Sequence, residues 1–168
     1  MNRLKKAIKY FGIFITLIML FRGFLYRISV NYLEVNTRNN ITLTDRKLIK
    51  EIDNRISDKI LSIEEIIELS NEITSEKLDF TFNKVSSNPN LVCELEKANC
   101  IGYSSLFNSI GNYIVEKQNL TEKFEFRHLI GKLEFFGLDI HKLFNSPFFK
   151  DHDFNEIRNK QTNEKKIC

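Results

Sequence analysis

The sequence predicts an α+β protein in which an N-terminal membrane-anchor helix precedes helices packed on a small antiparallel sheet. Three observations predict this class. A basic segment and an apolar run open the chain, segments of helical periodicity follow, and segments of strand-like alternation come last. With 168 residues, 42% of them hydrophobic, the chain can form one domain with its own core plus a small attachment.

The N-terminus has the composition of a signal anchor. Basic residues at positions 3, 5, 6 and 9 precede an apolar run over 10–21, and apolar residues continue after Arg22. A bilayer requires about 20 apolar residues, and no small-x-small cleavage site follows the run. We interpret 10–28 as an uncleaved anchor within a cytoplasmic and membrane segment, 1–33. The protein would be single-pass, with its domain outside the cytoplasm. The alternative is an interfacial or core helix.

Two helices are expected at the start of the domain. Residues 34–43 are polar and aperiodic, so we interpret them as a linker, and the domain as 44–168. Thr44 would cap a helix with an apolar face formed by Leu48, Ile49, Ile52, Ile56 and Ile60. The segment 62–65 reads as a capping box that opens a second helix. Its Glu64, Glu65 and Glu68 fit a solvated face, not an acid–base pair.

The second half of the chain carries the strand signals. A short extended segment over 78–82 precedes a turn at 88–90. Alternation over 124–130 predicts a strand that Gly131 ends or bulges. Residues 138–149 are expected to form an insertion with a short helix, and a last strand follows over 152–158.

Between these halves lies a helix that begins with a cysteine. Residues 97–107 read as a loop that delivers Cys100 to the first turn, and apolar residues recur behind it at positions 103, 106, 107, 110 and 114. A thiol at a helix N-terminus faces free N–H groups and the positive end of the helix dipole, which favour the thiolate. The alternative is a small core hydrophobe.

The segment 99–104, Asn-Cys-Ile-Gly-Tyr-Ser, resembles the Cys-x-Gly-Tyr-Ser signature of the transglutaminase-like superfamily, which has a papain-like cysteine-peptidase fold. The segment 150–157 resembles the histidine strand of that family. The resemblance covers about residues 60–168. It implies acyl transfer through a thioester on a protein or peptide substrate, with water or an amine as acceptor and without a cofactor.

Cys100 is the candidate nucleophile, and its own backbone N–H is a candidate donor to an oxyanion. His152, at the head of the last strand, is the candidate base. His128 and His141 compete with it. His128 alternates in phase with Phe124 and Phe126 and reads as a half-buried strand residue, whereas His141 falls in the expected insertion.

The third member of the expected site is missing. The resemblance implies an aspartate on the strand after the histidine strand. With a hairpin loop over 160–164, the position facing His152 falls three residues beyond Cys168. Asp151, Asp153 and Asn155 point to the other face of the strand. We therefore expect a domain that is incomplete at its C-terminus or works without the aspartate. The alternative function is a non-catalytic binding or scaffold domain, or a truncated inactive product.

Composition argues against several other classes. The net charge of +3 is mild and spread along the chain, so nucleic-acid binding has no support. The three cysteines have no paired histidine ligands, and no metal or cofactor motif is visible. Cys93 and Cys168 would pair in an oxidising compartment and leave Cys100 free. The alternative is three reduced thiols.

Overall fold

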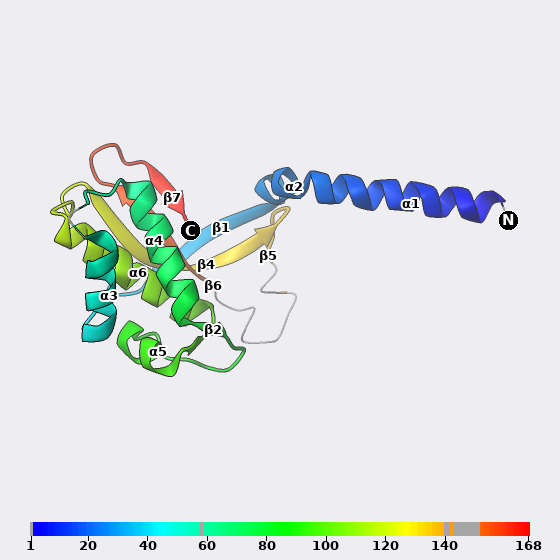
Figure 1. Cartoon of the computed structure of the whole chain (residues 1–168). Coiled ribbons are helices and arrows are strands. Elements are labelled where there is room, and N and C mark those ends of the chain that lie inside the picture. The colour runs from blue at the N-terminus through cyan, green and yellow to red at the C-terminus, as the bar shows by residue number, and fades with distance from the viewer. Residues whose placement is uncertain (1, 58, 140–141, 143–151) are drawn as a thin grey trace.

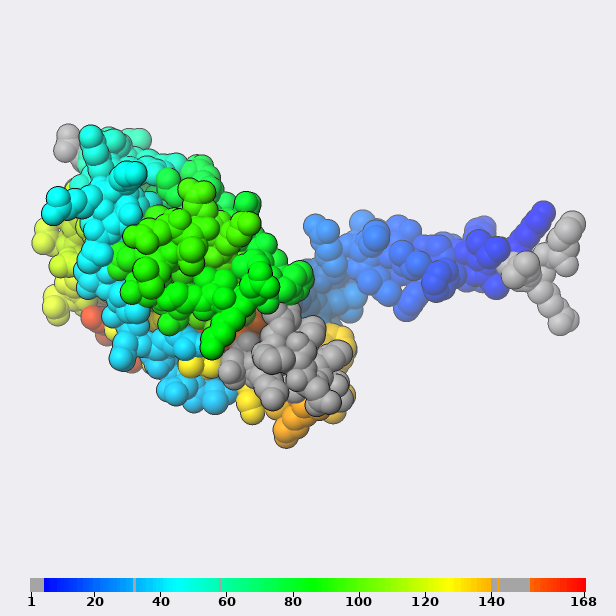
Figure 2. Space-filling model, turned by 90° about the horizontal axis from the view of Figure 1, so that it is seen from below, coloured from blue at the N-terminus to red at the C-terminus, as the bar shows by residue number. Residues whose placement is uncertain are grey.

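The computed structural model describes residues 2–57, 59–139, 142 and 152–168. It shows an α+β arrangement in which helices cover one face of a five-stranded antiparallel sheet. A helical N-terminal segment extends away from this domain, as two perpendicular views show (Figures 1 and 2). The expected α+β class, with helices packed on an antiparallel sheet, is therefore confirmed, although one strand precedes the helices of the domain.

The N-terminal segment consists of two helices, α1 (Asn2–Leu20) and α2 (Arg22–Ser29). Within the described residues, no single helix is both long and apolar enough to cross a bilayer. The pair Lys5–Leu20 and Arg22–Ser29 has the required length and composition when both parts are taken together, across a bend of 71°. The expectation of one continuous helix over 10–28 is therefore wrong, because two helices meet at a bend.

The break lies at Phe21, whose ψ of 10° departs from helical geometry. Gly23 falls in the first turn of α2, and glycine lowers helix propensity by about 1 kcal/mol relative to alanine. A break in the helix at this point therefore costs little free energy.

Residues 34–37 of the segment expected as a linker instead complete a strand, whereas 38–43 lie outside helices and strands. β1 (Val30–Thr37) follows α2 directly and pairs antiparallel with β4 (Phe124–Phe135). The sheet therefore includes residues from Val30, ahead of the domain start expected at Thr44. One residue of β1 is bulged, since Glu34 faces Gly131 and Asn36 faces Ile130. The irregularity expected at Gly131 thus lies on the partner strand, and β4 continues past it.

The remaining strands follow β4 across the sheet. The order is β1-β4-β6-β7, with β5 (Leu138–Asp139) paired to the far end of β4. β6 is His152–Asn159, close to the predicted 152–158, and β7 is Lys165–Ile167. A second, two-stranded parallel sheet joins β2 (Asp79–Phe80) to β3 (Lys97–Ala98).

Side-chain caps set the starts of the helices. α3 (Arg46–Ile56) is capped by Asp45, not by Thr44 as expected. α4 (Ile63–Lys77) begins with the predicted capping box, in which Ser62 and Glu65 each bond the other's backbone N–H. The expected turn at 88–90 is instead the start of α5 (Pro89–Leu95), where Asn88 is the cap and Pro89 occupies the first turn.

The central element is α6 (Cys100–Lys117), which lies between α4 and the sheet. Its predicted apolar face is confirmed, because Leu106, Ile110 and Ile114 are fully buried. The core around them is formed by residues from α3, α4 and the sheet, among them Ile52, Ile66, Ile73, Phe126 and Ile157.

Candidate functional site

The N-terminus of α6 carries the cysteine motif. The side chain of Asn99 caps the helix by accepting hydrogen bonds from the N–H groups of Ile101 and Gly102, at 3.1 and 3.4 Å. Cys100 is therefore the first helical residue, as predicted. A Cβ added at Gly102 would lie 2.7 Å from the Cβ of Ala98, so this glycine lets the helix start approach β3 closely.

A set of buried polar contacts joins the first turns of α6 to β6. Ser104 donates to the carbonyl oxygen of Asp153 at 2.9 Å, and the amide of Asn155 donates to the carbonyl oxygen of Ser104 at 2.9 Å. Asn108 donates to the side-chain oxygen of Asn155 at 3.0 Å. These contacts hold the beginning of β6 against the beginning of α6.

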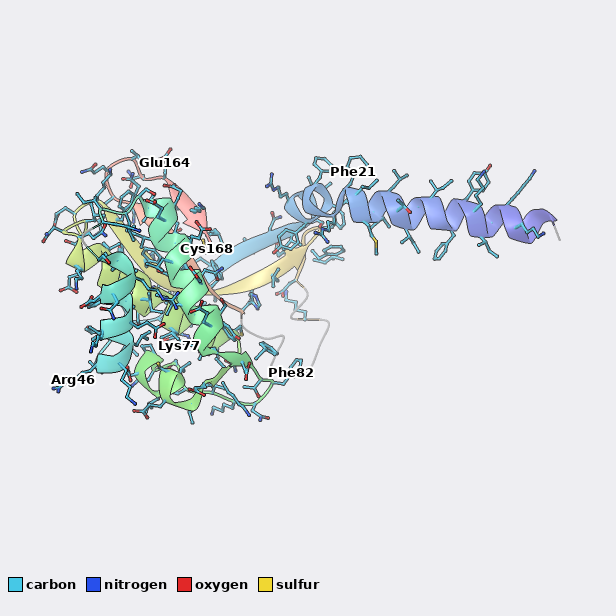
Figure 3. The ribbon with its side chains drawn as sticks, in the orientation of Figure 1. Phe21, Arg46, Lys77, Phe82, Glu164 and Cys168 are labelled. Atoms are coloured by element: carbon cyan, nitrogen blue, oxygen red, sulfur yellow. The ribbon has the colours of Figure 1, made fainter. Side chains whose placement is uncertain are left out.

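As a result, Cys100 and His152 line one pocket of about 640 Å³. The same pocket is lined by Tyr103 of α6, by Cys168 after β7, and by Tyr26 and Arg27 of α2. Figure 3 shows Cys168 toward the middle of the domain, whereas Glu164 lies at the outer end of the β6–β7 hairpin. The two residues singled out from the sequence thus line the same pocket, and their catalytic roles stay predictions.

The environment of the Cys100 thiol differs from the sequence-based expectation. Burial raises the pKa of Cys100, and the nearby carboxylate of Asp153 acts in the same direction. Hydrogen bonds from the backbone N–H groups of Asp153, Ile101 and Cys100 itself lower the pKa, but they do not outweigh burial. The helix start therefore acts as predicted, yet the net effect in this state favours the thiol.

A buried charged cluster lies beside the pocket. Nε2 of His128 is 2.7 Å from Oδ2 of Asp153, and the guanidinium of Arg38 bonds both oxygens of the same carboxylate. Burial acts to raise the pKa of Asp153, but the hydrogen bonds from His128 and Arg38 prevail and lower it. Asp153 is thus a carboxylate, and Nε2 of His128 carries the proton that it donates.

The sequence did not reveal this cluster. His128 was expected to be half-buried, but it is 3% exposed. Asp153 points away from the face of His152, as predicted, and its partners are His128 and Arg38. The only sequence signal was that His128 and Asp153 both face inward on their strands. His141 and Asp151 lie outside the described residues.

The register of the last hairpin agrees with the sequence-based estimate. Glu156 faces Ile167 and Ile157 faces Lys166, so each step back along β6 is a step forward along β7. His152, four residues before Glu156, would face the position four residues after Ile167, which is three beyond Cys168. Asn155 and Cys168 exchange two backbone hydrogen bonds of 2.9 Å.

All three cysteines are free thiols, so the Cys93–Cys168 disulfide is not formed and the alternative of reduced thiols describes the structure. Cys93 lies on α5, whereas Cys168 lines the pocket with Cys100. Among the described residues, no three His, Cys, Asp or Glu side chains are grouped as metal ligands.

Comparisons with family models, with curated proteins and with solved structures find no match to this chain. The resemblance to the transglutaminase-like superfamily therefore rests on the two sequence motifs alone.

Proposed function

We propose that this chain is a membrane-anchored, transglutaminase-like protein that transfers or hydrolyses acyl groups of protein or peptide substrates through Cys100 and His152. The observation that carries the proposal is the shared pocket, which receives Cys100 from the start of α6 and His152 from the head of β6. A nucleophile and a base that are distant in sequence must meet in space for this chemistry.

The chemistry assigns one role to each residue. His152 would take the proton of the Cys100 thiol, and the thiolate would attack the carbonyl carbon of the substrate amide. The backbone N–H of Cys100 would donate to the resulting oxyanion. Return of the proton to the amine releases it and leaves a thioester on Cys100. Attack by water or a second amine then releases the acyl product and restores the thiol.

The arrangement of the elements supports this reading. A cysteine at the first position of a central helix, packed on an antiparallel sheet with the histidine at the head of an adjacent strand, is what the family resemblance implies. The papain-like identity of this core is part of the proposal.

The membrane anchor is the second part of the proposal. Side chains along α1 are exposed on all sides, including Tyr10 (68%), Phe14 (59%) and Leu20 (73%). A helix that is apolar all round normally lies in a core or in lipid. The basic residues at positions 3, 5, 6 and 9 precede this apolar stretch, as expected of a cytoplasmic flank.

A non-catalytic binding domain is the second candidate, and one observation favours it. Burial raises the pKa of Cys100, so the thiolate is not the preferred form in the structure. For catalysis, proton transfer to His152 must overcome this effect. In a binding domain, the pocket would hold a ligand, and Cys100 would be one of the residues that line it.

The pH profile of Cys100 alkylation by iodoacetamide separates the two candidates. It is measured in the full chain in detergent, with Cys93 and Cys168 replaced by serine. If Cys100 reacts with an apparent pKa below about 8.5 and His152→Ala raises that pKa, the enzyme proposal is supported. Tyr103→Phe, another change in the pocket wall, should leave the profile in place. If His152→Ala leaves the pH profile unchanged, or if Cys100 reacts only when the protein unfolds, the catalytic pair is excluded.

A further inference from the structure

The tip of the β4–β5 hairpin is apolar and exposed. Phe135 ends β4, Leu138 begins β5, and Phe136 and Gly137 form the loop between them. Phe135, Phe136 and Leu138 are 49%, 64% and 64% exposed. The two phenyl rings meet edge to face, with centroids 4.8 Å apart. Three large apolar residues within four positions of an exposed loop are unusual unless they meet a partner.

The backbone at this tip makes the phenylalanine more unusual still. Phe136 has a φ of 49° and Gly137 a φ of 77°, so both loop residues are in the left-handed region. Two-residue hairpin loops of this kind favour Asn-Gly, because asparagine tolerates a positive φ and a bulky side chain does not. Folding alone would therefore favour a smaller, polar residue at position 136.

The tip is joined to the base of the N-terminal helices. The N–H of Phe136 donates to the carbonyl oxygen of Ser29, the last residue of α2, at 2.7 Å. Val30 faces Phe135 across β1 and β4, and Leu138 faces Phe135 from the other side, so three apolar side chains form a row across the sheet. Figure 1 shows the β4–β5 tip beside α2.

We propose that this tip and α2 together form a second membrane contact, which seats in the interfacial region of the bilayer that receives α1. The contact, here termed the aromatic collar, consists of Phe24, Ile28, Phe135, Phe136 and Leu138, and Phe24 and Ile28 are 62% and 52% exposed. The inference rests on the membrane part of the proposed function and is independent of the chemistry at Cys100.

Two observations favour a bilayer over a protein partner. The collar residues Phe24 and Ile28 follow α1 directly in the chain, and an apolar helix exposed on all sides favours an apolar surround over a partner on one face. The exposed cations Arg22 and Arg27 lie within the same short helix as Phe24 and Ile28. Aromatic side chains mixed with basic ones are typical of segments that lie at the interface and contact anionic headgroups.

The chain has no tryptophan, which permits single fluorescent reporters. Three variants of the full chain would be reconstituted into vesicles of phosphatidylcholine and phosphatidylglycerol, with and without bromine on the acyl chains. Phe14→Trp reports on α1 and Phe136→Trp on the collar. Phe82→Trp is the matched control, since Phe82 is 78% exposed and packs edge to face on Phe80 at 5.0 Å. Figure 3 shows Phe82 well separated from Phe21.

The expected result is a blue shift and bromine quenching for Phe14→Trp and Phe136→Trp, with neither effect for Phe82→Trp. If only Phe14→Trp responds, the anchor stands and the collar is wrong. If none responds, the anchor fails and the collar with it. A blue shift of Phe136→Trp that bromine does not quench indicates a protein neighbour and overturns the inference. Equal quenching of all three indicates non-specific adsorption and overturns it as well.

Discussion

His128 and Asp153 form a buried pair on the neighbouring strands β4 and β6, with 2.7 Å between Nε2 and Oδ2. Both residues are 3% exposed, and Arg38 completes the set from the segment after β1. The backbone N–H of Asp153 also faces the Cys100 thiol. The pair therefore helps to fix the position of the β6 residues that line the pocket.

Asp153→Asn should lower the free energy of unfolding by about 3 kcal/mol, because breaking one member of a buried pair leaves its partners uncompensated. Urea denaturation of the full chain in detergent measures the change. Asp79→Asn, at an exposed position of β2, should change it by less than about 0.5 kcal/mol. Equal effects of the two variants would show that the Asp153 cluster contributes nothing to stability.

The contribution of Asp153 should depend on pH with a defined sign. Its folded pKa is lowered, so its stabilisation is fully present above the unfolded pKa of about 3.9 and is lost as the pH falls through the folded value. The difference in unfolding free energy between the wild type and Asp153→Asn should shrink as the pH falls below about 4, where the Asp153 carboxylate takes up its proton. A difference that grows as the pH falls below about 4 would contradict the assigned pKa direction.

Gly131→Ala should destabilise the domain and disturb the pocket. A Cβ at this position would lie 2.1 Å from a ring carbon of Phe154 and 2.8 Å from the carbonyl oxygen of Leu33. Phe154 lines the pocket with Cys100, so its displacement should alter the alkylation rate of Cys100 as well. We expect a loss of about 1–3 kcal/mol in thermal or urea unfolding. Gly12→Ala, with nothing within 4 Å of the added Cβ, is the control and should not destabilise.

Ser62→Ala should remove the N-cap of α4 and lower stability by about 1 kcal/mol. Ser75→Ala changes the same residue type near the other end of this helix, where the exposed hydroxyl donates to the carbonyl oxygen of Glu72. Circular dichroism during urea unfolding should separate the two variants. Identical midpoints would mean that the capping box contributes no stability.

Phe136→Asn should raise the stability of the folded chain in detergent by about 1 kcal/mol, because asparagine relieves the strain of a positive φ. Phe82→Asn removes an equally exposed ring at a residue that does not have a positive φ, so it should give no such gain. Thermal unfolding in detergent compares them. A destabilised Phe136→Asn would show that the ring supports the hairpin itself.

The sequence predicted elements whose signal is local. The capping box at Ser62, the apolar face of α6 and the strand from His152 depend on residues within a few positions of one another, and all three are present. β1 was missed because it is an exposed edge strand without apolar alternation, and its conformation is set by pairing with β4.

The candidate site likewise has one part that the sequence predicted and one part that it did not. The order of two motifs led to Cys100 and His152, and the fold places both in one pocket. The Arg38–Asp153 contact joins residues 115 positions apart, and Arg38 falls in the segment expected to be a linker. The alternation of side chains along one strand predicts that Asp153 lies on the face opposite to His152. It does not predict which distant side chains contact Asp153.

The direct passage from Ser29 of α2 to Val30 of β1 has a consequence for where the domain can act. A flexible tether would let a catalytic domain sweep a hemisphere above its anchor. Here the last helical residue is followed at once by a strand that is paired within the sheet, so the domain keeps one orientation relative to α2. If α1 and α2 lie in a bilayer as proposed, Cys100 would stay at a fixed height above it, and the proposed substrates would reach it by lateral diffusion within a thin layer.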